Sequence, residues 1–331
     1  MVKDTLGRAM RDLRVSVIDR CNFRCRYCMP REQFGSDYPY LSRSEILTFE
    51  EIDSLVGALL PLGVEKVRLT GGEPLLRRDL VKLVEMLSKH GVEVALTTNG
   101  ALLSEHAFSL ATAGLDRVTI SLDAVDEETF QSMSDTEVSV DAVFAGIDAA
   151  LEAGLSPVKV NSVIQRGVNE HSIMDLVERF EGTDVQVRFI EYMDVGTTNG
   201  WRRDEVVSAA EILDIIRSRK MVARVGRPNP SQVAEEWITV DGFRFGLIPS
   251  VTQPFCGDCT RARLSSEGSL YTCLFSESGH DLKSMLREGA THDEIRAKVT
   301  GIWQERADRY SELRGEERGI RLPVEMSHIG G

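Results

Sequence analysis

The feature that most constrains the fold is an alternation of strand-like and helix-like segments along the first 220 residues. Strand-like runs occupy residues 12–18, 65–70, 92–98, 116–123, 157–164 and 184–193. Helical periodicity follows them in residues 50–60, 78–91, 104–114, 140–154, 172–182 and 208–219. Such repetition predicts parallel β/α units joined by right-handed crossovers.

The six runs alternate between apolar and polar residues, whereas the strands of a closed β/α barrel, buried on both faces, are mostly continuous apolar runs. The polar parity is largely cationic or hydroxylated: Arg14, Ser16, Lys66, Arg68, Thr70, Thr119, Ser121, Lys159 and Asn161. Successive side chains of a strand point to opposite faces, so these residues share the inner face. The pattern predicts an α/β fold, an open partial barrel that holds a ligand. A one-sided sheet facing water is the alternative, which flanking helices disfavour.

The pattern changes after about residue 220. Shorter strand-like pieces at 235–240, 243–249 and 262–266 precede a helical tail that starts at about residue 281. We therefore predict two regions, residues 1–220 and 221–331.

Composition excludes several classes of protein. The 331 residues carry a net charge of −13 and an isoelectric point near 5.1, which argues against nucleic-acid and acidic-membrane partners. No run approaches the roughly 18 apolar residues of a membrane span. The start, MVKDTLGRAMRDLR, has no signal-peptide core. We expect a cytoplasmic protein.

Three cysteines, Cys21, Cys25 and Cys28, follow the first strand with C-x3-C-x2-C spacing. Three thiols suit neither paired disulfides nor the usual four-ligand zinc site, and the six cysteines of the chain fall into two such groups. A 4Fe–4S cluster takes one ligand per iron, so three cysteines leave one iron open. The position after a strand is the usual active-site mouth of a β/α barrel. A Cys3His zinc site is the alternative, but the nearest histidine is His90.

The same spacing, with an aromatic residue (Tyr27) before the last cysteine, resembles the signature of radical S-adenosylmethionine (SAM) enzymes. GGEP after the second strand resembles the family motif that lines the methionine of SAM, with Gly72 allowing close approach and Glu73 facing the ammonium. In that family the open iron binds SAM, and an electron from the cluster cleaves it to methionine and a 5′-deoxyadenosyl radical. Thr98 and Ser121, at the ends of strands three and four, are expected near ribose or carboxylate.

The second group is Cys256, Cys259 and Cys273, spaced C-x2-C-x13-C. Zinc is a stronger rival here because C-x2-C is its common half-site, with His280 as the nearest fourth ligand. The repeated count of three and the neighbouring Arg261 and Arg263 favour another cluster with an open iron.

Cations from different strands converge on the predicted interior: Arg14, Lys66, Arg68, Lys159 and, with less certain parity, Arg188. Burying unpaired cations costs several kcal/mol each, so the group implies a polyanion such as a nucleoside triphosphate. The chain has no GxxxxGK[ST] loop, so side chains would hold the phosphates. The chain ends in Gly330 and Gly331, which can thread a narrow space.

Across almost its whole length the sequence is similar to the radical SAM GTP cyclases that open molybdenum cofactor biosynthesis. The second cysteine triad with its arginines and the Gly-Gly end carry this finer resemblance, and Thr260 departs from it where asparagine is expected. The resemblance implies a partial (β/α)6 TIM-like barrel whose open side is covered by the C-terminal region.

The resemblance also implies roles for individual residues. One cluster on Cys21, Cys25 and Cys28 cleaves SAM, and a second on Cys256, Cys259 and Cys273 binds guanine. SAM contacts are expected from Tyr27, Gly72, Glu73, Ser121, Asn161 and Met193. GTP contacts are expected from Arg14, Lys66, Arg68, Thr98, Lys159, Arg188, Arg261 and Arg263. Arg14, Arg261 and Arg263 are further expected to act after hydrogen abstraction, and the terminal glycines to enter the site.

The resemblance further implies a flavodoxin-like electron donor, a homodimer and transfer of product to a cyclic pyranopterin synthase. Two other functions remain open from the residues: a radical SAM enzyme that modifies peptides, and a non-catalytic iron–sulfur or zinc sensor.

Overall fold

The computed structural model describes residues 1–227, 232–316 and 322–331. In these residues one sheet has the strand order β12-β11-β10-β1-β2-β3-β4-β5-β6-β9-β8-β7. The strands are β1 (Asp12–Ser16), β2 (Lys66–Thr70), β3 (Glu93–Thr98), β4 (Arg117–Ser121), β5 (Val158–Ile164), β6 (Val185–Glu191), β7 (Val222–Gly226), β8 (Glu235–Thr239), β9 (Arg244–Ile248), β10 (Arg261–Leu264), β11 (Ser269–Tyr271) and β12 (His280–Asp281).

The first six strands are parallel neighbours in sequence order, and the sheet does not close. The predicted partial barrel is therefore confirmed. Each of the six predicted strands is present, with ends within about two residues of those expected.

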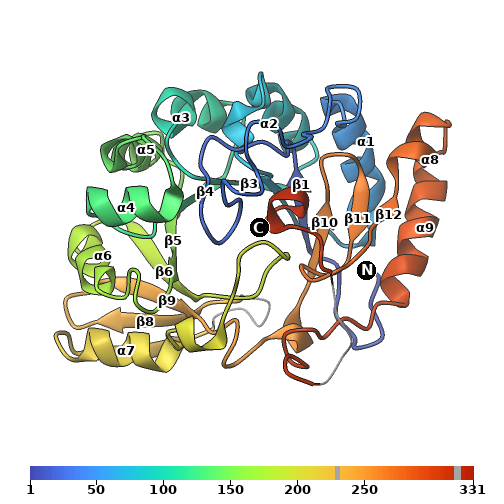
Figure 1. Ribbon diagram of the computed structural model, residues 1–331. Helices are drawn as coiled ribbons and strands as arrows, with labels where there is room; N and C mark the ends of the chain where they lie inside the picture. Colours follow the sequence, from blue (N-terminus) through green and yellow to red (C-terminus); the bar gives the residue numbers. More distant parts are fainter. Residues whose placement is uncertain (228–231, 317–321) are drawn as a thin grey trace.

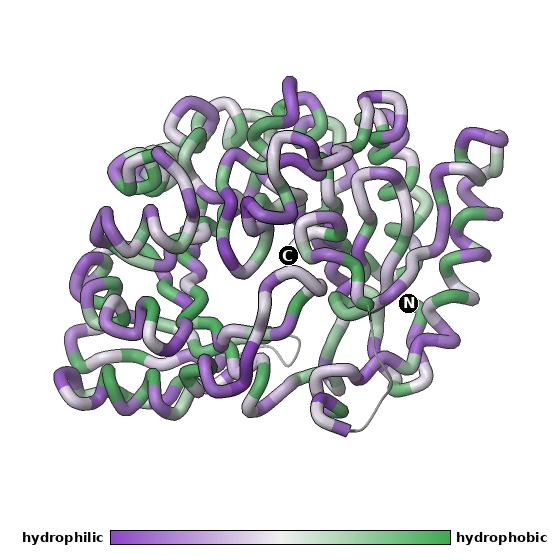
Figure 2. Tube along the Cα trace, in the orientation of Figure 1, coloured by the Kyte–Doolittle hydropathy of each residue, from purple (hydrophilic) through white to green (hydrophobic). Residues whose placement is uncertain are grey.

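Helices lie on the outside of the curved sheet, and the chain end lies within its curve (Figure 1). The helices are α1 (Phe49–Leu59), α2 (Leu80–Ser88), α3 (Leu103–Thr112), α4 (Glu127–Ser134), α5 (Val140–Glu152), α6 (Ser172–Phe180), α7 (Ala209–Arg217), α8 (Lys283–Arg287), α9 (His292–Gln304) and α10 (Met326–Ile329). The apolar parity of the strands, including Leu13, Val67 and Val118, is fully buried against them. Hydrophobic and hydrophilic residues alternate along the helices, as a one-sided core requires (Figure 2).

The C-terminal region extends both edges of the six-stranded unit. β10 pairs in parallel with β1, and β9 pairs in parallel with β6. β8 and β11 then continue the sheet as antiparallel neighbours. The boundary near residue 220 stays a prediction, because strands from both sides of it share one sheet.

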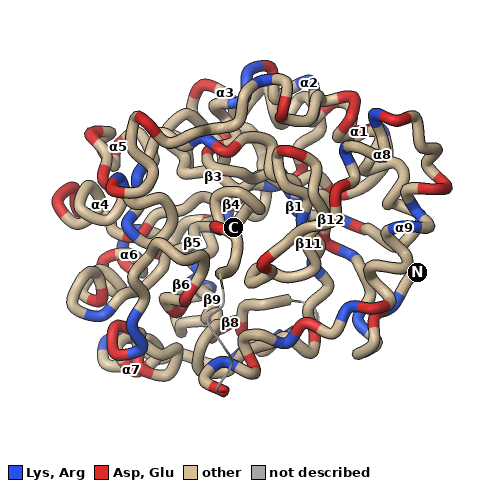
Figure 3. The backbone as a smooth tube through the Cα atoms, turned by 45° about the vertical axis from the view of Figure 1, so that its right-hand side comes forward, with Lys and Arg blue, Asp and Glu red and all other residues tan. Residues whose placement is uncertain are grey.

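Charged residues are spread over the outer helices, and basic positions also occur on strands of the sheet (Figure 3). Within the described ranges, no helix combines the length and apolarity that crossing a membrane would require.

Candidate active site

The two cysteine triads lie at opposite ends of β1. Cys21, Cys25 and Cys28 follow β1, whereas Cys256 and Cys259 directly precede β10, which runs parallel to β1. β1 has five residues, so at about 3.3 Å per residue it separates its two ends by roughly 13 Å. Side chains of the inner face lie between the two triads.

The loop that carries the first triad is held by α4, a helix that the sequence did not predict. The carbonyls of Ser134 and Met133 at the end of α4 accept from the backbone N–H groups of Arg24 (2.9 Å) and Arg26 (3.1 Å). The Phe23 ring packs edge-on against Phe130, with centroids 5.9 Å apart. These contacts fix the backbone between the cysteines.

The three thiols of this loop influence one another electrostatically. Burial, followed by the nearby Cys21 and Cys28, raises the pKa of the Cys25 thiol well above its ordinary value. Burial and the Glu73 carboxylate raise the pKa of Cys21 to about 12. The site therefore disfavours bare thiolates and suits thiolates bound to a positively charged metal group.

The GGEP turn packs directly on the cysteine loop. A Cβ added at Gly72 would overlap the backbone carbonyl of Arg20, so this position requires glycine. Glu73 is 1% exposed and accepts from Thr98 Oγ1 (2.7 Å), Asn99 N (2.7 Å) and Leu75 N (3.0 Å). Burial raises the pKa of Glu73 to about 7 despite these hydrogen bonds.

Thr98, which was expected to contact GTP, is therefore hydrogen-bonded to Glu73. The neighbouring Thr97 is the threonine that contacts Arg68, another residue expected to bind GTP. Arg68 Nη1 donates to Thr97 Oγ1 and to Thr119 Oγ1, each at 3.2 Å. β3 places Thr97 on the inner face with Ala95, and Thr98 has the opposite parity.

The remaining predicted SAM contacts lie around the ends of β4 to β6. Tyr27 donates from its hydroxyl to Asp123 Oδ2 at 2.7 Å, which ties the cysteine loop to the end of β4. Ser121 and Asn161 are register partners on β4 and β5, and Asn161 Oδ1 is a buried acceptor without a donor among the described residues. Met193 follows β6 and is half-buried.

Three arginines form a row across the inner face. Arg263, Arg14 and Arg68 are register partners on β10, β1 and β2. Adjacent strands are about 4.8 Å apart, so three like charges lie side by side. Burial and then Arg263 hold the pKa of Arg14 well below its ordinary value, and Arg14 Nε has no acceptor in the described chain.

The next row toward the second triad alternates in charge instead. Its register partners are Arg261, Asp12, Lys66 and Glu93. Lys66 Nζ lies 2.8 Å from Asp12 Oδ2, so this predicted GTP contact is already paired with a carboxylate. In the described interior, the cations without a neighbouring carboxylate are therefore those of the arginine row.

Thr119 joins the cations of the far side of the barrel. Its Oγ1 accepts from Arg188 Nη2 at 3.3 Å as well as from Arg68, and Lys159 is its register partner. Arg188 therefore lies on the inner face. Burial, followed by Arg188 and other cations, lowers the pKa of Lys159 to about 7. Burial and Arg68 lower the pKa of Arg188 to about 9.

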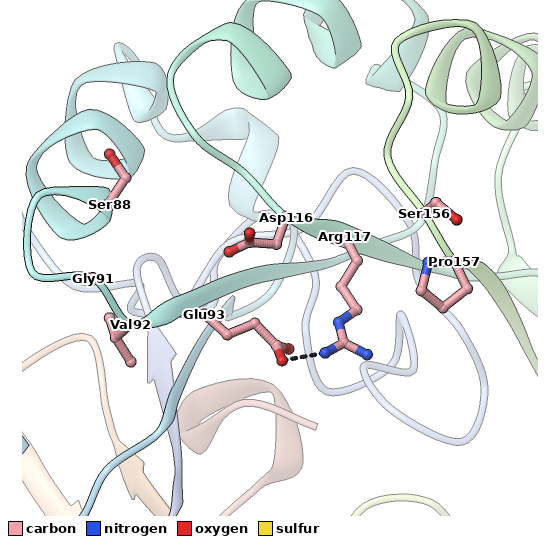
Figure 4. A pocket seen from close by; sticks show the side chains of 8 residues that line it. All are labelled: Ser88, Gly91, Val92, Glu93, Asp116, Arg117, Ser156 and Pro157. Carbon is pink, nitrogen blue, oxygen red and sulfur yellow. Dashed lines mark hydrogen bonds and ion pairs between the residues drawn. The ribbon is translucent and has the colours of Figure 1, made fainter.

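Arg117 is an inner-face cation that the sequence reasoning missed, although it has the same parity as Thr119 and Ser121. Its register partner is Ala95, the neighbour of Arg68, and its guanidinium pairs with the Glu93 carboxylate. Arg117 and Glu93 line an open pocket of about 670 Å³ at the amino ends of β3 to β5, together with Asp116 and Ser156 (Figure 4). This pocket is at the end of the barrel away from the first triad.

Around the second triad, Arg261 Nη2 donates to Cys259 Sγ at 3.3 Å. Burial alone would raise the pKa of Cys259, but Arg261 and Arg306 lower it to about 6. Burial raises the pKa of Cys273 to about 11. The backbone carbonyl of Thr260 accepts from Arg11 N (3.0 Å) and Asp12 N (3.2 Å), and these contacts do not depend on whether the side chain is threonine or asparagine.

The arrangement fits clusters better than single metal ions. All six cysteines are free, and no three Cys, His, Asp or Glu side chains in the described ranges are grouped to hold one ion. His280, the proposed fourth zinc ligand, is exposed on β12. Thiolates around a cluster of several atoms lie farther apart than around one zinc ion.

The chain end lies in the interior beside the arginine row. Arg263, 3% exposed, donates from Nη1 to the backbone carbonyl of Gly330. Gly330 has φ +77°, and a Cβ there would overlap Thr70 Cγ2, so the position requires glycine on two grounds. Gly331 packs against Met326.

Comparison with known proteins decides the family. Residues 15–180 match the Radical SAM superfamily and residues 185–312 match Molybdenum Cofactor Synthesis C. The GTP 3′,8-cyclase of Acidothermus cellulolyticus is 48% identical over 360 residues, covering 100% of this chain and 99% of the relative. The chain belongs to the GTP 3′,8-cyclase family. Family members of Staphylococcus carnosus (47% identical, 99% of its length covered) and Xanthomonas campestris pv. campestris strain B100 (48%, 97%) also match along the whole chain.

Solved structures resemble this GTP 3′,8-cyclase family member in fold. Streptococcus suis SuiB bound to S-adenosylmethionine superposes with a TM-score of 0.62 over 94% of this chain and 69% of SuiB, at 15% identity. At that identity the likeness shows a shared fold only. A SuiB structure bound to its precursor peptide matches with the same TM-score of 0.62, over 94% of this chain and 68% of SuiB.

Proposed function

We propose that this chain is a radical SAM lyase that converts GTP into (8S)-3′,8-cyclo-7,8-dihydroguanosine 5′-triphosphate, the first step of molybdenum cofactor biosynthesis. In this reaction the C3′ radical of GTP closes on guanine C8. The observation that carries the proposal is the cationic inner face between two free cysteine triads, in a chain matched along its whole length by GTP 3′,8-cyclases.

The two triads fit the two 4Fe–4S clusters of the family. Cys21, Cys25 and Cys28 would hold one cluster, which would supply the electron for SAM cleavage. Cys256, Cys259 and Cys273 would hold the other, which would supply an open iron for the guanine base.

The side chains of the barrel do the binding and orienting. Lys66, Arg68, Lys159 and Arg188 surround the triphosphate and ribose. Lys66 is paired with Asp12, so Arg68, Lys159 and Arg188 supply most of the charge that compensates the polyanion. Thr98 donates to Glu73 Oε1 at 2.7 Å, so it acts by holding a carboxylate that faces SAM rather than by touching GTP. SAM is oriented by Tyr27, Gly72, Glu73, Ser121, Asn161 and Met193.

Arg261 bonds to Cys259 of the second triad, and Arg263, the register partner of Arg14, bonds to the chain end. In the proposed mechanism these three arginines position the substrate radical and guide the electron and proton that complete the product. Arg263 also holds Gly330, so the tail and the substrate meet the same guanidinium.

The proposal extends to the surroundings of the enzyme. A cytoplasmic location, a flavodoxin-like electron donor, a homodimer and delivery of the product to a cyclic pyranopterin synthase all follow from the family resemblance.

Anaerobic reconstitution with iron, sulfide, dithionite and SAM tests the function. We expect 5′-deoxyadenosine and a GTP-derived cyclic product in equal amounts when GTP is present. SAM cleavage at the same rate with and without GTP would indicate a radical SAM enzyme with another substrate, such as a peptide. Absence of SAM cleavage under both conditions would favour a sensor.

A further inference from the structure

The thiol of Cys259 differs from the other described thiols in its hydrogen-bond donors. Its Sγ accepts from two guanidinium groups, Arg261 Nη2 at 3.3 Å and Arg306 Nη2 at 3.2 Å. In the described ranges, the donors to other cysteine sulfurs are neutral: Phe23 N and Asn99 Nδ2 to Cys21, at 3.4 and 3.9 Å, and Phe275 N to Cys273, at 3.5 Å.

Arg306 makes this contact from a buried position in the protein interior. It is 4% exposed, and its guanidinium lies 4.5 Å from the centroid of the Trp303 ring. Its Nη1 donates to the backbone carbonyl of Cys259 at 2.8 Å, so one side chain bonds both the carbonyl and the sulfur of the same cysteine. Such a fork needs the planar geometry of arginine.

The carboxylate of Asp4 completes the arrangement from the amino end of the chain. Asp4 Oδ2 lies 3.3 Å from Arg306 Nη1 and 2.5 Å from Arg8 Nε. Arg8 Nη1 in turn donates to the carbonyls of Cys256 (2.7 Å) and Asp308 (2.8 Å). Residues from both ends of the chain therefore brace the Cys256–Cys259 loop.

Hydrogen bonds to a cluster-ligating sulfur alter the properties of the cluster. A donor withdraws electron density from the thiolate, and a cationic donor stabilises the additional negative charge of the reduced state. Reduction potentials of iron–sulfur clusters depend on such bonds and on net charge. Two guanidinium donors on one sulfur therefore both raise the reduction potential.

We propose that Arg306 is a positioning residue for the second cluster, which it serves by fixing the Cys256–Cys259 loop and by raising the reduction potential through its bond to Cys259 Sγ. Asp4 moderates that effect because it neutralises part of the Arg306 charge. The inference rests on the proposed function only in assigning a cluster to Cys256, Cys259 and Cys273.

The test is a potentiometric titration followed by electron paramagnetic resonance. The full chain carries Cys21→Ala, Cys25→Ala and Cys28→Ala, so that the second cluster alone gives the signal. We expect Arg306→Gln to lower the midpoint potential and Asp4→Asn to raise it. A tenfold change in the ratio of oxidised to reduced cluster corresponds to about 59 mV for one electron.

Arg309→Gln is the matched control. Arg309 lies near Cys256 but its Nε bonds to Glu312 Oε2 at 2.6 Å and no bond joins it to a sulfur in the described chain. We expect its removal to change the potential much less than removal of Arg306. If both arginine variants shift the midpoint potential equally, the effect comes from long-range charge and not from the bond to Cys259. That result would overturn the proposal.

Opposite signs for Arg306→Gln and Asp4→Asn support the proposal, and equal potentials or shifts of the same sign overturn it. If Arg306→Gln binds no iron, the sign of the Asp4→Asn shift decides alone. Failure of the proposed function appears elsewhere, as an unmodified protein that assembles no second cluster or forms no product from GTP.

Discussion

The guanidinium of Arg263 donates to the backbone carbonyl of Gly330, the penultimate residue of the chain. Arg263 is also the register partner of Arg14, so the chain end lies beside the row of Arg263, Arg14 and Arg68, which has no ion-pair partner among the described residues. The tail is thereby part of the wall of the candidate site.

This contact predicts that Gly330→Ala impairs product formation. The new Cβ would overlap Thr70 and the left-handed backbone at φ +77° would be strained, so the tail must move. We expect a loss on the order of a hundredfold in cyclic product, a size that misplacement of a catalytic contact can cause. Gly289→Ala, at φ +90° with open space around it, carries similar strain without a clash and should retain activity. Normal turnover after deletion of Gly330 and Gly331 would show that the tail is incidental.

Cys256→Ser tests the second triad. We expect the variant to keep the first cluster, so that iron falls from about eight to about four per chain, and to lose GTP cyclisation. Iron analysis and product chromatography measure the two outcomes separately. A variant with full cyclase activity would remove the second cluster from the mechanism.

Lys159 makes GTP binding depend on pH. Its pKa of about 7 means that the free protein loses this charge as pH rises through 7, and a bound polyanion favours the protonated form. The dissociation constant for GTP should therefore rise above pH 7, by up to about tenfold per pH unit until the pKa of the bound state is reached. Calorimetry from pH 6.5 to 8.5 measures it. Lys159→Arg should bind with little dependence on pH, and an unchanged slope in that variant would exclude Lys159 as the cause.

The same depressed pKa affects stability with a defined sign. Between pH 7 and the ordinary lysine value, the unfolded chain binds a proton that the folded chain does not. The contribution of Lys159 to the free energy of unfolding therefore increases with pH across that window.

The ion pair of Glu93 and Arg117 predicts two opposite effects on substrate affinity. Glu93→Gln frees an inner-face cation and should lower the dissociation constant for GTP severalfold, whereas Arg117→Gln should raise it. Arg11 and Glu65 form a comparable pair, 3.5 Å apart, on residues of the outward parity, so Arg11→Gln is the control. If Arg117→Gln and Arg11→Gln bind GTP equally well, Arg117 does not contact the substrate.

Glu325 connects the tail to the loop after β6. Its carboxylate accepts from Thr197 N (2.8 Å), Thr197 Oγ1 (2.7 Å) and Thr198 Oγ1 (3.0 Å), and a Cβ at Gly196 would overlap it. We expect Glu325→Gln to make the tail more accessible to carboxypeptidase and to reduce product formation severalfold. Glu288→Gln, at the exposed residue that directly follows α8, should match the unmodified protein. Equal digestion rates for the two variants would contradict this role of Glu325.

Local patterns were sufficient for the barrel and for the cysteines. Alternation along β1, β2, β4 and β5 predicted both the strands and their polar inner face, because strand geometry translates parity directly into direction. Cysteine spacing indicated the radical SAM family because the three ligands lie close together in the chain.

Other parts of the site depend on contacts that no local pattern reports. α4 contains few large apolar residues, of which Phe130 and Met133 are buried, and its role comes from the cysteine loop that it contacts. Arg306 reaches Cys259 across 47 positions and Asp4 across 302, so neither contact has a sequence signature. The parity of Arg117 in the sequence matches that of the inner-face residues. It was not predicted to lie there because the arginine is at the beginning of its strand.

The pairing of β10 with β1 and of β9 with β6 also sets an order of events during synthesis. The six strands leave the ribosome with both edges unpaired, and exposed edges are prone to association with other chains. Residues 244–264 cover both edges only after all six strands have been synthesised. A chain that stops before residue 244 therefore lacks its edge strands, its second triad and its tail together, and we expect such a copy not to act on the nucleotide.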